Sequence, residues 1–363
     1  MFTLIPVPRK PKSYLDAIKI VAIFMVIFNH TDSFYAHMEL LSQPLHWLTM
    51  GHSMIIGTAV PLFFMCSGAT LLGREEPMDR LFLHRVLRFV VILALVSILI
   101  YVENNGTDNL DLRDFFMRLY RNGVSYHLWY MYSYISFLIM LPLLRKIARG
   151  MNTGIMLLLV ASAVLTETLP IVDYFIFHGE NSHTSHFYLL ASCNYLLFPM
   201  CGYYLDNVLP KEKLSVDALF VLFMGTLFSI WISCLLMDAR SRLEGGWSTA
   251  NMGTYINTFT LFPAIFLFCA FKRLFVDRKL PSFLVKLLSI LSSCTFGVYL
   301  FEGIFRRHTR FVYEALYEKT GAYAANWIHA LCSLIAGLAC VFLWKCLTGL
   351  IRAAVLKAFP GRK

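Results

Sequence analysis

Long apolar stretches alternate with short polar segments along the whole of this 363-residue chain. A helix that crosses a bilayer needs about 20 apolar residues, so each long stretch predicts one membrane-spanning helix. The predicted spans are Tyr14–Phe34, Met54–Leu72, Leu83–Val102, Leu128–Leu144, Ile155–Asp173, Phe187–Leu205, Ala218–Met237, Met252–Phe271, Leu284–Glu302 and Ala324–Leu347. A shorter segment, Leu110–Arg121, has apolar residues at helical spacing opposite charged ones, which predicts a short interfacial helix. The pattern therefore predicts an all-α, polytopic integral membrane bundle of about ten transmembrane helices.

Composition excludes a soluble globule, because 58% of the residues are hydrophobic, 15% are charged and the mean hydropathy is +0.62. The excess of 32 Lys and Arg over 22 Asp and Glu fits basic inner loops, and no long basic stretch with interleaved aromatics predicts nucleic-acid binding. The basic residues gather in alternate loops, so the positive-inside rule places both termini in the cytoplasm. We expect a single domain, 1–363, in the cytoplasmic (inner) membrane, with several passes and no appended soluble domain.

The first predicted span carries an unusual number of polar groups at its ends. Its apolar run Ile20–Phe28 is bounded by Asp16 and Lys19 on one side and by Asn29 and His30 on the other. Lys19 and His30 are eleven residues apart, which brings them to nearly the same helix face at roughly 16 Å of rise. An imidazole in a bundle can accept a hydroxyl proton, or it can pack against a neighbouring helix through a hydrogen bond. Both interpretations of His30 remain open at this point.

Two arginines begin the third predicted span. Arg85 and Arg88 are three residues apart, so they share one face of a regular helix. Guanidinium groups hold phosphate well, although anchoring at the inner leaflet is the more common role of basic residues beside a span. The nine cysteines show no C-x-x-C spacing, so the sequence predicts neither a disulfide framework nor a metal site.

Several segments together resemble the acyltransferase-3 family of integral membrane acyltransferases, which are mostly bacterial and modify cell-surface carbohydrates. They are YLDAIKIVAIFMVIFNH, which ends at His30 like the family's opening helix; PLFFMCSG (61–68), similar to F-F-x-x-S-G; Arg85 and Arg88, similar to R-x-x-R; HLWYMYSYISFLIMLP (127–142), similar to H-L-W-F-L; and TFGVYLFE (295–302), similar to S-F-G-I-Y-L. This chain has Lys19 where many relatives have arginine, and Glu302 where many end the last motif with histidine. The segments occur in the family's order over most of the chain.

The resemblance implies transfer of an acyl group, with acetyl expected first, from cytoplasmic acyl-coenzyme A to a hydroxyl of a surface glycan or lipid-linked sugar. His30 would be the catalytic base and Glu302 would assist it. The other expected roles are acyl-coenzyme A binding by Arg85, Arg88, Lys19 and Ser67, and acceptor binding by His127 and Trp129. Counting about 1.5 Å per residue, His30 and Glu302 both lie some 24 Å from the inner ends of their helices. The thioester is already activated, so no bound cofactor or metal is expected.

A second function class stays open. In a transporter or flippase of a lipid-linked sugar, Asp16, Lys19, His30 and Glu302 would form a proton relay. Ser67 fits close helix packing as well as donor binding, and Trp129 fits an interfacial aromatic belt as well as sugar stacking. Membrane lipid is an expected partner in every case, and the sequence does not predict the oligomeric state.

Overall fold

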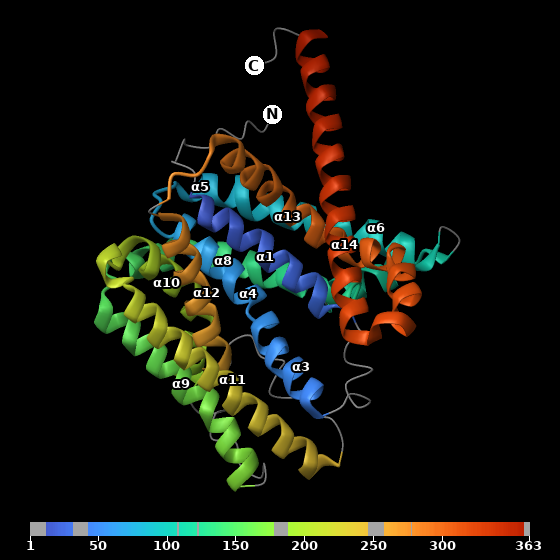
Figure 1. Ribbon diagram of the computed structural model, residues 1–363. Helices are drawn as coiled ribbons and strands as arrows, with labels where there is room; N and C mark the ends of the chain where they lie inside the picture. The colour runs from blue at the N-terminus through green and yellow to red at the C-terminus, as the bar shows by residue number, and fades with distance from the viewer. Residues whose placement is uncertain are drawn as a thin grey trace.

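A computed structural model gives the arrangement of the helices (Figure 1). It describes residues 12–31, 43–106, 109–121, 123–177, 188–245, 258–276 and 278–358. The α-helices are α1 (Ser13–Asn29), α3 (Gln43–Ile56), α4 (Ala59–Leu71), α5 (Met78–Leu81), α6 (Leu87–Asn105), α7 (Leu112–Tyr120), α8 (Trp129–Arg149), α9 (Thr153–Ile176), α10 (Tyr188–Tyr203), α11 (Val216–Glu244), α12 (Thr258–Val276), α13 (Ser282–His308) and α14 (Arg310–Ala358). Short π-helices cover Phe82–Val86 and Tyr204–Val208, and 3₁₀ turns cover Tyr126–Leu128 and Lys211–Lys213.

Many of these helices suit a membrane. Within the described ranges, seven helical stretches are long and apolar enough to cross one: Leu45–Leu71, Met78–Asn105, Tyr126–Arg149, Thr153–Ile176, Val216–Glu244, Ser282–His308 and Arg310–Ile351. The remaining three predicted spans coincide with α1, α10 and α12. Outward apolar side chains such as Leu95, Phe220 and Leu343 are more than half exposed, as lipid-facing residues are. The chain is a helical, multi-pass membrane protein, while ten spans and cytoplasmic termini remain predictions.

Helix α1 lies in the middle of the bundle (Figure 1) and contacts α3, α4, α12, α13 and α14. Its sequence fits the position, because polar and charged groups such as those at both ends of α1 are more stable beside protein than beside lipid. Ile18, Ile23 and Ile27 are fully buried. The predicted first span, Tyr14–Phe34, is longer than α1, and its last residues lie outside the described part of the chain. Because α1 is central, other helices surround the polar groups at both of its ends.

Helices α4 and α10 cross at very short distance. A Cβ atom on Gly68 would lie 2.8 Å from Pro199 Cα, and one on Gly202 would lie 2.5 Å from Met65 Cα. Such contacts are closer than real side chains allow, so only glycine fits at either position. Small residues at a crossing let two helix backbones approach, which gives packing energy inside a membrane. This crossing fixes the position of α4, which carries Ser67.

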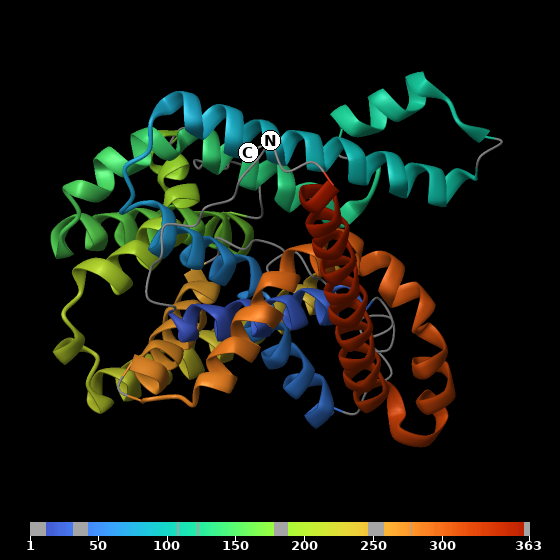
Figure 2. The same ribbon diagram turned by 90° about the horizontal axis from the view of Figure 1, so that it is seen from above.

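Two helices, α13 and α14, change direction partway along their length. Phe301 in α13 has non-helical dihedral angles of φ −119° and ψ 15°. In α14 the break is at Gly321, with φ 78°, in the region that glycine adopts without steric cost. Figure 2 shows the chain reversing direction within α14, so that its long second arm returns along the bundle.

The predicted short amphipathic helix is confirmed as α7. The Asp111 carboxylate accepts a 2.7 Å hydrogen bond from the backbone N–H of Arg113 and caps the helix. Phe115 is buried against Tyr101, with ring centroids 5.4 Å apart, while Phe116 remains exposed. The helix therefore has one side on the protein and a second apolar side available to a membrane surface.

Candidate functional site

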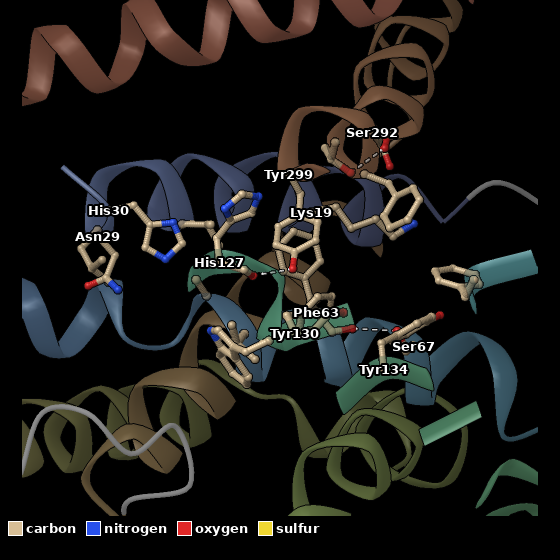
Figure 3. Close-up of a pocket in the computed structure, with 18 residues that line it drawn as sticks. Lys19, Asn29, His30, Phe63, Ser67, His127, Tyr130, Tyr134, Ser292 and Tyr299 are labelled. Carbon is tan, nitrogen blue, oxygen red and sulfur yellow. Dashed lines mark hydrogen bonds between the residues drawn. The ribbon is translucent and has the colours of Figure 1, made fainter. Parts of the chain in front are cut away.

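A cavity of about 260 Å³ lies among α1, α4, α6, α8 and α13 (Figure 3). Five of the eight residues that the sequence singled out line it: Lys19, His30, Ser67, His127 and Trp129. Most of its other walls are apolar or aromatic, which is typical of a binding pocket with a few placed polar groups. The cavity extends along the polar face of α1 from Lys19 to His30, because both residues line it. The eleven-residue spacing therefore corresponds to the length of one connected space.

His30 occupies the C-terminal cap of α1, where its backbone N–H still bonds to the carbonyls of Val26 and Ile27 at 3.1 Å each. Its side chain is buried, and Nδ1 lies 2.9 Å from Glu302 Oε1. An ionised carboxylate can only accept, so Nδ1 carries the hydrogen and Nε2 keeps its lone pair. An Nε2 lone pair beside a cavity is the arrangement that a general base requires.

Glu302 reaches this position because of the break in α13. It follows Phe301, the residue with non-helical angles, and its side chain is 1% exposed. A buried carboxylate is stable only with partners. Besides His30, its neighbours are His127 Nδ1 at 3.6 Å from Oε1 and Arg306 Nε at 3.7 Å from Oε2. The side chains of His30, His127 and Arg306 therefore surround the Glu302 carboxylate.

His127 connects α8 to the same break. Its Nε2 lies 3.3 Å from the carbonyl of Leu300, and its Nδ1 lies 2.9 Å from Ser125 Oγ. The Tyr299 hydroxyl donates to the His127 carbonyl at 2.6 Å (Figure 3). Both ring nitrogens of His127 therefore have hydrogen-bond partners inside the protein. These contacts hold the segment of α13 that leads into Glu302.

Lys19 marks the other end of the cavity. Its Nζ lies 3.6 Å from Asp16 Oδ1, and Ser292 donates a 2.7 Å hydrogen bond to that same Asp16 oxygen. Asp16 and Lys19, three residues apart on α1, therefore form an ion pair. It makes a cation in a membrane helix tolerable, and the Ser292 bond ties α1 to α13 at this level.

Neither Arg85 nor Arg88 lines the cavity. Arg85 lies in the π-helix Phe82–Val86 and donates to Glu76 Oε2 at 2.8 Å, while Arg88 is exposed. A π turn holds more residues than an α turn, so the spacing from Arg85 to Arg88 is not that of a regular α-helix. Arg85 interacts electrostatically with Tyr134, which does line the cavity. Arg85 is therefore near the cavity, while Arg88 is exposed in the first turn of α6.

Glu76 was not expected from the sequence, yet it joins two helices. It accepts from Arg85, and also from Arg145 Nη2 at 3.3 Å. Burial by itself raises the pKa of the Glu76 carboxyl, but hydrogen bonds from Arg85 and Arg145 outweigh it and hold that pKa below its usual value. Arg145 is buried and also donates to the Leu71 carbonyl at 3.2 Å. This group fixes the guanidinium of Arg85.

Ser67 lines the cavity, and its hydroxyl donates to the Phe63 carbonyl one turn earlier at 2.9 Å (Figure 3). Trp129 packs edge-on against Tyr130, with centroids 6.4 Å apart. Tyr130 is a lining residue that sequence reasoning missed. The signal was present, because the segment HLWYM has tyrosine where the H-L-W-F-L motif has phenylalanine.

Comparison with known proteins identifies the family. The family described as "Acyltransferase domain" (acyltransferase-3) matches residues 12–345, which is nearly the whole chain. The search of curated proteins and the search of solved structures each found no significant match. The chain belongs to the acyltransferase-3 family and is a membrane acyltransferase.

Proposed function

We propose that this member of the acyltransferase-3 family transfers an acyl group, acetyl in the first instance, from cytoplasmic acyl-coenzyme A to a hydroxyl of a surface or lipid-linked carbohydrate. The observation that carries the proposal is the buried His30–Glu302 pair, with its 2.9 Å hydrogen bond, at one end of a cavity that reaches Lys19 at the other. The protein would act in the cytoplasmic membrane, with the Lys19 end of the cavity facing the cytoplasm.

His30 is the general base in this mechanism. Its Nε2 removes the proton from the acceptor hydroxyl while the hydroxyl oxygen attacks the thioester carbonyl carbon. Glu302 keeps the hydrogen on Nδ1 and stabilises the imidazolium that forms, in the way a carboxylate supports histidine in hydrolase triads. The tetrahedral intermediate then breaks its C–S bond. The coenzyme A thiolate leaves with the proton from His30, and the acyl group stays on the acceptor oxygen.

The remaining residues fit binding roles on either side of this step. Arg85 and Arg88 would attract the phosphates of coenzyme A outside the Lys19 end, and Glu76 would hold Arg85 ready. Lys19 and Ser67 would line the path of the pantetheine arm. Trp129 offers a ring for a sugar beside the reacting hydroxyl. His127 supports Glu302 through α13 and, at the cavity wall, also meets the acceptor.

The first experiment replaces His30 by alanine and measures acyl transfer from labelled acetyl-coenzyme A to envelope glycans in membrane vesicles. Transfer should fall to background at a normal protein level, while acetyl-coenzyme A still binds to the purified variant. A variant that transfers at the normal rate would end this mechanism. A wild-type protein that ignores coenzyme A and responds to a proton gradient would instead support the transporter.

A further inference from the structure

Tyr130 carries a hydroxyl group that has no hydrogen-bond partner among the described residues. It lies in the first turn of α8 and lines the cavity (Figure 3). Within the described part of the chain, its hydroxyl makes no hydrogen bond; the side chain is half-buried, and the hydroxyl is accessible from the cavity rather than sealed in the core. A tyrosine hydroxyl that faces a cavity can donate to water or to a bound ligand. The missing partner of Tyr130 is therefore to be sought among molecules that enter the cavity.

The ring of Tyr130 is held in a fixed orientation by other rings. Its centroid lies 5.3 Å from that of Phe64 and 5.4 Å from that of Tyr299, both in edge-on contacts. Phe63 and Tyr134 follow at 6.1 Å and 5.8 Å. A hydroxyl on a ring packed this way is preorganised, so a ligand that accepts its hydrogen bond does not need to order the side chain first.

The position of Tyr130 along the cavity suggests which atom it meets. His127 lies in the 3₁₀ turn before α8, and Tyr130 follows it by three residues, a rise of about 4.5 Å or slightly more, in the direction of the Lys19 end. His127 lies at the level of Glu302, 3.6 Å from its Oε1. If the thioester of the acyl donor reacts at His30, its pantetheine arm leads back toward Lys19 and passes Tyr130.

We infer that the Tyr130 hydroxyl donates a hydrogen bond to an amide carbonyl of the pantetheine arm of the acyl donor, which makes it a donor-recognition residue. The inference rests on the proposed function. In pantetheine the first amide carbonyl carbon follows the sulfur by four bonds of about 1.5 Å, which extended span roughly 5 Å. That length matches the distance of about 4.5 Å between the levels of His127 and Tyr130.

The test compares wild-type protein, Tyr130→Phe and Tyr132→Phe, each purified as the full chain in detergent. Tyr132 lies on the same helix, but its hydroxyl donates to the Leu119 carbonyl at 2.5 Å and it does not line the cavity. Binding is measured by calorimetry with two ligands, acetyl-coenzyme A and adenosine 3′,5′-bisphosphate, which lacks the arm.

Tyr130→Phe should weaken acetyl-coenzyme A binding roughly two- to tenfold, the usual worth of one neutral hydrogen bond. It should leave adenosine bisphosphate binding unchanged, and Tyr132→Phe should change neither. Unchanged acetyl-coenzyme A binding in Tyr130→Phe, or equal weakening of both ligands, would overturn this inference while leaving the acyltransferase proposal in place. Absence of acetyl-coenzyme A binding by the wild-type protein would overturn both.

Discussion

Replacing Glu302 by glutamine removes the charge beside His30 and keeps the size of the side chain. The carboxylate is fully enclosed, and its oxygen lies 2.9 Å from His30 Nδ1. Without the charge, the imidazolium that forms during proton transfer loses its counter-ion. The amide can also turn its NH₂ group toward His30, which would move the ring hydrogen to Nε2 and block the base.

The size of the effect follows from the geometry. Two unit charges about 4 Å apart interact by about 4 kcal/mol at an effective dielectric constant of about 20. A neutral amide still accepts a hydrogen bond worth about 1 kcal/mol, and Arg306 shares the Glu302 charge at 3.7 Å. We therefore expect transition-state stabilisation to fall by about 2–3 kcal/mol, or kcat by roughly 30- to 150-fold.

The assay is the initial rate of transfer from labelled acetyl-coenzyme A to envelope glycans in membrane vesicles, normalised to protein level. Glu103→Gln is the matched control, because Glu103 pairs with Arg307 on the exposed surface. An exposed pair contributes at most about 1 kcal/mol, so the control should lose less than roughly fivefold. If Glu302→Gln keeps the rate of the control, Glu302 does not support His30 and the reasoning fails.

Three further predictions concern packing, stability and donor binding. Gly202→Ala should lower the free energy of unfolding by more than about 3 kcal/mol, because its Cβ meets the Met65 backbone. Gly349→Ala, with nothing within 4 Å of the added Cβ, should be neutral or stabilising by up to about 1 kcal/mol; equal thermal unfolding of the two variants in detergent would contradict this account. The lowered pKa of Glu76 contributes stability that is fully present above its ordinary pKa, near 4.3, and is lost as pH falls through the lower folded-state pKa. At pH 7 the wild-type protein should therefore have a higher melting temperature than Glu76→Gln, and this difference should shrink below about pH 4. A difference that grows below about pH 4 would refute the predicted direction of the pH dependence. Arg85→Ala and Arg88→Ala should each weaken acetyl-coenzyme A binding in calorimetry, and unchanged dissociation constants would remove both arginines from the donor site.

The site shows where sequence reasoning succeeds. Helix periodicity is a local property, so the eleven-residue spacing is enough to place Lys19 and His30 on one face of α1, and both line the same cavity. The same reasoning overlooked Glu76, because a single glutamate in a loop between two spans has no pattern. Arg85 and Arg88 were expected on one face of a regular helix, but Arg85 lies in the π turn Phe82–Val86 and donates to Glu76. Hydropathy and spacing carry no signal for such a local change of helix type.

The sequence by itself determined that the chain is helical and membrane-embedded, that α1 carries a polar face, and that its motifs belong to an acyltransferase family. These features depend on composition and on neighbours along one helix. Only the tertiary structure decided that Glu302, 272 residues away, meets His30, and that Tyr130 lines the same cavity as His30. The physical reason is that contacts between helices depend on where a helix breaks, as at Phe301, and on how closely backbones pack, as at Gly68. Those are properties of the whole bundle and not of any single segment.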